Sequence, residues 1–274
     1  MNDRHIRSLA SGLRGVDAAI GGAAGLAGGL LGVGGGFLMV PLQVMWADTP
    51  PRRASGNSLA AIVPIAIVGA LVYYFGQGTH QLNLTVALFV MVGGSVGAVV
   101  GSLLSARVPD RSLRMLVAVL LVVAALKELY DAFLGGSGTL EATTSLDFVP
   151  VQYLLLVLSG AVIGILSGLT GVGGGVLVVP LLVVGFGIGQ RVAQGTSLLA
   201  ILPTAAFGAI VHYRQGELDA GASGRMALAG VPAALIGSVL ALALPQRILA
   251  GLFGLLLLVI AVRMWPTRPE AAES

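Results

Sequence analysis

The chain has 274 residues, of which 56% are hydrophobic and only 10% are charged, and its mean hydropathy is +0.96. Soluble domains carry about 25% charged residues, so a water-soluble fold is excluded and the bilayer must surround most of the chain. The net charge is +3, but the basic residues are scattered between apolar stretches, which indicates membrane orientation and excludes a nucleic-acid partner. The chain has no cysteine, which excludes disulfides and thiolate chemistry.

Eight apolar segments in chain order predict an all-α integral membrane protein. Six of them are close to 20 residues long, about the length of a helix that crosses ~30 Å of hydrocarbon. The first and the fifth are longer and contain glycine runs. The eight segments are 16–46, 54–75, 83–106, 112–134, 149–187, 193–213, 225–244 and 246–265.

The two halves of the chain are homologous. An offset of 139 residues aligns 25–42 with 164–181 at 12 of 18 identical positions, and 54–64 with 193–203 at 7 of 11. Biased composition alone predicts about one identity in ten, so the agreement indicates a duplication. The polar stretch GGSGTLEATTSLD separates the copies. We therefore expect an N-terminal repeat (1–134), a polar linker (135–148) and a C-terminal repeat (149–274).

Loop charges favour an inverted arrangement of these repeats. If each glycine-containing segment crosses the membrane once, eight Lys and Arg lie on the N-terminal side and seven on the other. If each segment is a re-entrant hairpin, the count is twelve against three, the three being Lys127, Arg191 and Arg247. The positive-inside rule then predicts six spanning helices, two re-entrant hairpins and both termini in the cytoplasm. Residues 149–170 are long enough to span alone, so the spanning alternative stays open.

The motif GVGGG occurs at residues 32–36 and again at 171–175. Each glycine costs a helix about 1 kcal/mol relative to alanine, and unwound backbone at membrane depth needs surrounding protein or a water-filled cavity. One interpretation is close helix packing. The other is a substrate site made of backbone amides at two broken helices. This second interpretation assigns substrate binding to Gly34, Gly35, Gly36, Gly173, Gly174 and Gly175.

Small polar residues open the segment that follows each glycine run. They are N-caps in one interpretation. In the other, their side chains and the positive end of the helix dipole bind an anion without a formal charge; this concerns Asn57, Ser58, Thr196 and Ser197.

Arg52 and Arg191 precede these residues, either as steering groups at two mouths or as headgroup anchors. Pro64 and Pro203 lie inside the same segments, where a proline sets either a fixed kink or a hinge.

Carboxylates are absent from the middle of every predicted span; Asp17, Glu128 and Asp131 all lie near predicted ends. This disfavours coupling through buried carboxylates, and His212 is expected at an interface. An intramembrane enzyme would need an acid–base pair, metal ligands or a nucleophile. We therefore expect no enzyme activity, no metal and no cofactor.

The sequence carries two copies of G-x-x-G-x-G-G-G-x-x-x-x-P, at Gly29–Pro41 and Gly168–Pro180, followed by GNS and GTS. The paired motif resembles the TauE/SafE family of sulfite and organosulfur anion transporters over nearly the whole chain. The resemblance implies a bacterial inner-membrane permease that moves sulfite, sulfonates such as sulfoacetate, or related anions, mostly outward.

By the same resemblance, Gly56–Ser58 and Gly195–Ser197 line the substrate path. An anion channel stays open as the alternative, because two half-helices that meet at mid-membrane can also build a pore. The expected partners are a small anion and the lipid bilayer. The oligomeric state, the identity of the anion and the energy source are left open.

Overall fold

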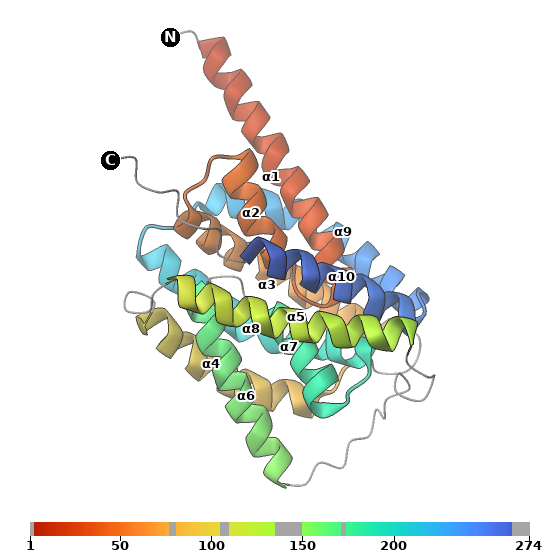
Figure 1. Cartoon of the computed structure of the whole chain (residues 1–274). Coiled ribbons are helices and arrows are strands. Elements are labelled where there is room, and N and C mark those ends of the chain that lie inside the picture. Colours follow the sequence, from red (N-terminus) through yellow and green to blue (C-terminus); the bar gives the residue numbers. More distant parts are fainter. Residues whose placement is uncertain (1–2, 77–80, 105–109, 135–149, 171–173, 265–274) are drawn as a thin grey trace, which may run out of the picture.

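The computed structural model describes residues 3–76, 81–104, 110–134, 150–170 and 174–264; the polar linker and Gly173 lie outside these ranges. Every regular element in the described residues is helical (Figure 1). The elements are α1 (Asp3–Leu31), α2 (Gly36–Trp46), α3 (Pro51–Phe75), α4 (Leu84–Leu104), α5 (Asp110–Phe133), α6 (Pro150–Thr170), α7 (Gly175–Pro180) with a π-helical turn (Leu181–Gly185), α8 (Gln190–Arg214), α9 (Ala220–Ala243) and α10 (Gln246–Met264).

Six helices are long and apolar enough to cross a membrane, namely α3, α4, α6, α8, α9 and α10. The number agrees with the prediction. By length and composition α6 is among the six, which is the spanning alternative left open above, whereas the C-terminal part of α5 carries three charged residues. Large apolar side chains on these helices face outward, with Leu88, Val239 and Leu255 each more than half exposed. Apolar surface of this extent is typical of contact with lipid, and the chain is therefore a multi-pass membrane protein.

The first glycine run interrupts the helix and turns the chain back. Gly32, Gly34 and Gly35 have φ of 72°, 74° and 85°, a region that other residues enter only with strain. A Cβ on Gly35 would lie 2.3 Å from the Ala24 carbonyl oxygen, and Met39 shares a buried cluster with Ala24 and Ile20. Helix α2 thus folds back along α1 (Figure 1).

The described end of the second glycine run has a left-handed backbone like that of the first. Gly174, at φ 68°, is the counterpart of Gly35 at the offset of 139. A Cβ on Gly174 would lie 3.2 Å from Ser167 Oγ and 3.7 Å from Ile163 Cγ2. Ser167 and Ile163 are the counterparts of Gly28 and Ala24, which surround Gly35 in the first half.

Helices of one half pack mainly on helices of the other. Helix α1 packs most extensively on α9, and its counterpart α6 packs on α4, the counterpart of α9. Helix α3 contacts α9 as α8 contacts α4, while α3·α8 and α5·α10 join counterparts directly. Glycine lets the backbones approach closely: a Cβ on Gly25 would lie 2.2 Å from the Gly230 oxygen, and a Cβ on Gly97 2.0 Å from the Ala161 oxygen. The aligned halves therefore interlock by matched contacts.

Candidate functional site

The two glycine turns meet in the interior of the protein. A Cβ on Gly175 would lie 2.6 Å from the Val33 carbonyl oxygen, so the turns are in direct contact. A Cβ on Gly34 would lie 2.7 Å from Ile201 Cδ1 and 3.1 Å from Ile62 Cγ2. Ile62 on α3 and Ile201 on α8 are counterparts in the two halves. Both turns and the inner faces of α3 and α8 thus form one buried centre.

Two helix N-termini open at this centre without a capping side chain. Helix α2 begins at Gly36 and α7 at Gly175, and no side chain caps either end. The first backbone N–H groups of a helix have no partner within the helix, and the N-terminus carries a partial positive charge. Such an end can bind an anion through backbone groups alone. The predicted glycines Gly36 and Gly175 are the first residues of these helices.

The carbonyl end of α1 accepts hydrogen bonds from side chains of two other helices, α3 and α9. The buried Tyr73 hydroxyl donates to the Gly29 oxygen at 3.2 Å and lies 3.1 Å from Gln194 Oε1. The Ser238 hydroxyl donates to the same Gly29 oxygen at 3.3 Å. Sequence reasoning missed Tyr73, Gln194 and Ser238. A polar side chain inside an apolar helix was the available signal, because buried polar groups need partners.

Asn57 is buried and fully engaged in a network between the halves. Its Oδ1 accepts from the Asp219 backbone N–H at 2.7 Å, and its Nδ2 donates to Gln43 Oε1 at 3.1 Å. Gln43 in turn donates to the main-chain oxygens of Met39 and Ala54, at 3.1 and 3.2 Å. Gln43 was also missed, although it is the sole amide side chain of the Gly36–Trp46 helix.

Thr196 makes the matching contact in the other half. Its Oγ1 accepts from the Asn83 backbone N–H at 3.0 Å. Asn83 caps the start of α4 through Val86 N–H (3.0 Å), as Asp219 caps α9 through Gly221 N–H (2.8 Å). Each half therefore binds the capping residue that precedes a helix of the other half.

The capping interpretation fails for the helices that carry these residues. The N-cap positions of α3 and α8 are Pro50 and Gly189, neither of which makes a side-chain cap. Asn57 and Thr196 lie two turns inside their helices.

Ser58 and Ser197 are counterparts in the two halves, and Ser197 contacts the first residue of α7. Ser197 Oγ donates to the Gly175 oxygen at 3.5 Å, and both side chains are fully buried. Ser58 Oγ has no hydrogen-bond partner among the described residues. A buried hydroxyl without a partner costs about 1–3 kcal/mol, which a bound ligand would recover.

Gly56 and Gly195 serve packing in this conformation. A Cβ on Gly56 would lie 2.4 Å from the Glu217 oxygen, and a Cβ on Gly195 2.2 Å from the Gln81 oxygen. Glycine at position 56 lets the α8–α9 loop approach α3, and glycine at position 195 lets the α3–α4 loop approach α8.

The predicted steering arginines occupy different environments. The Arg52 side chain is 84% exposed, and its Nη1 lies 3.5 Å from Glu217 Oε1. Arg191 is partly buried and donates to the Leu244 main-chain oxygen just beyond α9. Helices α3 and α8 continue through Pro64 and Pro203, so the hinge role of these prolines stays a prediction.

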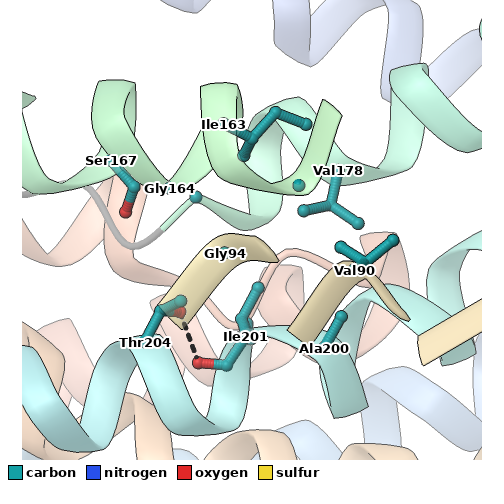
Figure 2. A pocket seen from close by; sticks show the side chains of 11 residues that line it. Val90, Gly94, Ile163, Gly164, Ser167, Val178, Ala200, Ile201 and Thr204 are labelled. Carbon is teal, nitrogen blue, oxygen red and sulfur yellow. Dashed lines mark hydrogen bonds between the residues drawn. The ribbon is translucent and has the colours of Figure 1, made fainter. Parts of the chain in front are cut away.

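A small cavity adjoins the second glycine turn, between α4, α6, α7 and α8 (Figure 2). Its volume is about 10 Å³, room for one water molecule and too little for sulfite. Val90, Ile163 and Val178 converge on it, and Thr204 donates to the Ile201 oxygen at 2.8 Å on one side. This cavity is therefore too small for the anion in this conformation.

The equivalent space in the first half is filled. At the counterparts of Val178 and Thr204 the first half has Met39 and Ile65, and both are fully buried. An offset of 136 likewise places Met226 at the position of Val90. Larger side chains thus fill one half and leave the cavity in the other.

Three carboxylates are buried: Asp17 in the middle of α1, and Glu128 and Asp131 in the last two turns of α5. Asp17 accepts from Arg225 at 2.7 and 3.0 Å, and Asp131 accepts from Lys127. Glu128 is 1% exposed and contacts an amide. The expected position near a helix end holds for Glu128 and Asp131 but is wrong for Asp17, because α1 begins at Asp3. The argument against buried carboxylates does not hold, because neighbouring helices cover all three. His212 lies in the last turn of α8, with Nδ1 3.4 Å from Glu217 Oε2.

Comparison with known proteins gives concordant matches. A probable membrane transporter of Bacillus subtilis, YdhB, is 26% identical over 183 residues, which cover 66% of this chain and 71% of that protein. A second one, YjnA, is 39% identical over 79 residues (29% and 31%), and a probable membrane transporter of Xylella fastidiosa is 31% identical over 126 residues (45% and 48%). The last two matches span less than half of those relatives.

The model of the family described as Sulfite exporter TauE/SafE matches residues 4–128 and 156–274, one segment in each half. Since these segments cover most of the chain and include both glycine turns, this protein belongs to the TauE/SafE family of membrane transporters.

Proposed function

We propose that this protein is a secondary transporter that exports small sulfur-containing anions, such as sulfite or sulfonates including sulfoacetate, across the bacterial inner membrane. The observation that carries the proposal is the meeting of two uncapped helix N-termini, at Gly36 and Gly175, in the protein interior. Backbone amides there match a compact anion and need no buried cation. Family membership supports the same class of solute.

The substrate site in this proposal lies between the two turns. Amides at Gly34–Gly36 and Gly173–Gly175 bind the anion, with the Ser58 and Ser197 hydroxyls beside them. The unpartnered Ser58 Oγ supports this assignment. Asn57 and Thr196 contribute by holding the α9 and α4 helix starts that enclose the site. Because the cavity beside the second turn is too small for the anion, binding there requires a conformational change, which supports a carrier rather than an open channel.

The proposed topology has inverted repeats, re-entrant α1–α2 and α6–α7 hairpins and both termini in the cytoplasm. The matched packing of α1 on α9 and of α6 on α4 supports a two-fold relation between the halves. The loop-charge count supports the orientation. The chain contains no cysteine, so Thr49→Cys, between α2 and α3, can be labelled alone. Labelling by an impermeant maleimide only in inside-out vesicles is expected; labelling of intact cells contradicts the re-entrant model.

Reconstitution tests the function itself. Purified protein is screened for thermal stabilisation by sulfite, sulfate, thiosulfate and methanesulfonate, and then placed in liposomes for flux measurements. We expect sulfite or a sulfonate to raise the melting temperature and to show saturable flux with counterflow, which a channel does not show. Absence of both stabilisation and flux above protein-free liposomes for every anion tested would refute the proposal.

A further inference from the structure

Glu128 differs from the other buried carboxylates of the described chain because no cation contacts it. Its side chain is 1% exposed. Asp17 has Arg225 and Asp131 has Lys127 as partners. Lys127, the neighbour of Glu128 in the chain, thus forms its ion pair with Asp131. A buried carboxylate is usually paired, because removing a charge from water is costly. One without a cation reduces that cost by binding a proton.

The contact of Glu128 suits both protonation states. With its NH₂ turned to the carboxylate, Gln190 Nε2 lies 3.2 Å from Glu128 Oε2 and 3.3 Å from Oε1. With the amide turned by 180°, its carbonyl oxygen takes that place and accepts from a protonated carboxyl. Among neutral side chains, amides offer both a donor and an acceptor at the same position.

The surroundings of Glu128 contain few other charges. The charged groups that act on it are Lys127 and Asp131, from its own helix. The part of α10 that packs against it is glycine: a Cβ on Gly254 would lie 3.1 Å from Glu128 Cβ, and residues 250–258 include no ionisable side chain. On α8, the charged residue next to Gln190 is Arg191, which donates to Leu244.

The position of Glu128 connects it to both the surface and the proposed substrate site. Lys127 beside it is 39% exposed, so a proton has a short path from that face. Gln190 is the first residue of α8, and a carboxylate stabilises a helix N-terminus by its charge. Ser197, which contacts Gly175 at the second turn, lies two helical turns further along α8, about 10 Å away. Protonation of Glu128 therefore weakens its electrostatic stabilisation of the N-terminus of α8, the helix that reaches the proposed substrate site.

We propose that Glu128 is a proton-binding site and that one proton binds and leaves there in each transport cycle. The inference rests on the proposed anion transport and adds its coupling ion. The pair joins the two halves and has no equivalent, because the counterparts of Glu128 and Gln190 are Met264 and Pro51. Proton coupling thus arises at one of two corresponding contacts between the halves.

The test measures sulfite transport in liposomes for three proteins: wild type, Glu128→Gln, and Asp131→Asn as the matched control on the same helix. Net efflux and sulfite–sulfite exchange are recorded across a series of pH values. Sulfite itself titrates in this range, so net efflux is divided by exchange at the same pH. We expect the wild-type ratio to change with pH by up to about tenfold per unit, the slope of one titrating group.

Glu128→Gln is expected to keep exchange, lose the pH dependence of the ratio and unfold at a temperature no lower than wild type, because it removes a buried charge. Asp131→Asn is expected to keep a pH-dependent ratio with its midpoint moved to lower pH, because it removes a neighbouring negative charge and frees Lys127 to act on Glu128. Wild-type dependence in Glu128→Gln overturns the inference. If that variant cannot be purified, a wild-type ratio independent of pH overturns it as well. Absence of any wild-type sulfite flux would instead refute the proposed function.

Discussion

Three Gly→Ala substitutions separate the two reasons for glycine at the first turn. Gly35 has φ 85°, and a Cβ there would lie 2.3 Å from the Ala24 oxygen. Gly187 has φ 66° and open space around a Cβ, and Gly22 is helical with the same open space. Alanine therefore meets strain and a main-chain clash at Gly35, strain alone at Gly187, and neither at Gly22.

The magnitudes follow from these contacts. Positive φ costs alanine about 1–2 kcal/mol, which is the whole effect expected for Gly187→Ala. Gly35→Ala adds a main-chain shift of about 1 Å, and overpacking of this kind costs about 1–3 kcal/mol more. Gly22→Ala is expected to stabilise by up to about 1 kcal/mol, the helix propensity difference.

Thermal unfolding of the purified variants in detergent measures the series. At roughly 2–4 °C per kcal/mol for a chain of this size, Gly35→Ala is expected to unfold about 5–15 °C below wild type. Gly187→Ala should fall between it and wild type, and Gly22→Ala should equal or exceed wild type. A melting temperature for Gly35→Ala equal to that of Gly187→Ala would refute the close approach of α2 to α1. Equal loss for Gly22→Ala would refute the reasoning as a whole.

Further substitutions test the contacts around the centre. Tyr73→Phe removes one of the two side-chain donors to the buried Gly29 carbonyl and is expected to destabilise by about 1–2 kcal/mol; an unchanged unfolding temperature would argue against the contact. Asn57→Leu leaves the side-chain amide of Gln43 and a backbone N–H without their partner, so it should weaken sulfite affinity and lower the free energy of unfolding by about 2–5 kcal/mol. Thr196→Leu should also weaken sulfite affinity, with a smaller loss of stability. Ligand-dependent melting temperatures measure both effects. Thr204→Ile copies the filled half and should raise stability while slowing flux; faster flux would mean that the cavity is not on the path.

The sequence predicts much of the fold because membrane proteins obey few, strong rules. Hydropathy locates the helices, since every span must be apolar over about 20 residues. Three adjacent glycines locate the turns, since L-residues rarely adopt positive φ. At α5 and α6 length and charge point in opposite directions, so hydropathy by itself does not choose which of the two crosses the membrane. The rules failed for Glu128, because closeness to a helix end says nothing about which helices cover that end.

The candidate site was less predictable, because its contacts join residues far apart in the chain. Asn57 meets Asp219, 162 residues later, and Tyr73 meets Gln194, 121 residues later. The motif letters place Asn57 and Thr196 in a helix but cannot state their partners. Their contacts with α9 and α4 depend on how the halves interlock.

By themselves, the composition and the glycine pattern predicted the membrane environment, the all-helical class, the homology of the two halves and the two places where helices break. These properties are local: each follows from the free energy of a short segment in lipid. The tertiary structure decided which polar groups meet, that the two turns touch, that one half is filled while the other keeps a cavity, and that Glu128 is buried against Gln190. Those properties depend on the packing of distant segments, where a single methyl group or amide changes the outcome without altering the hydropathy of either segment.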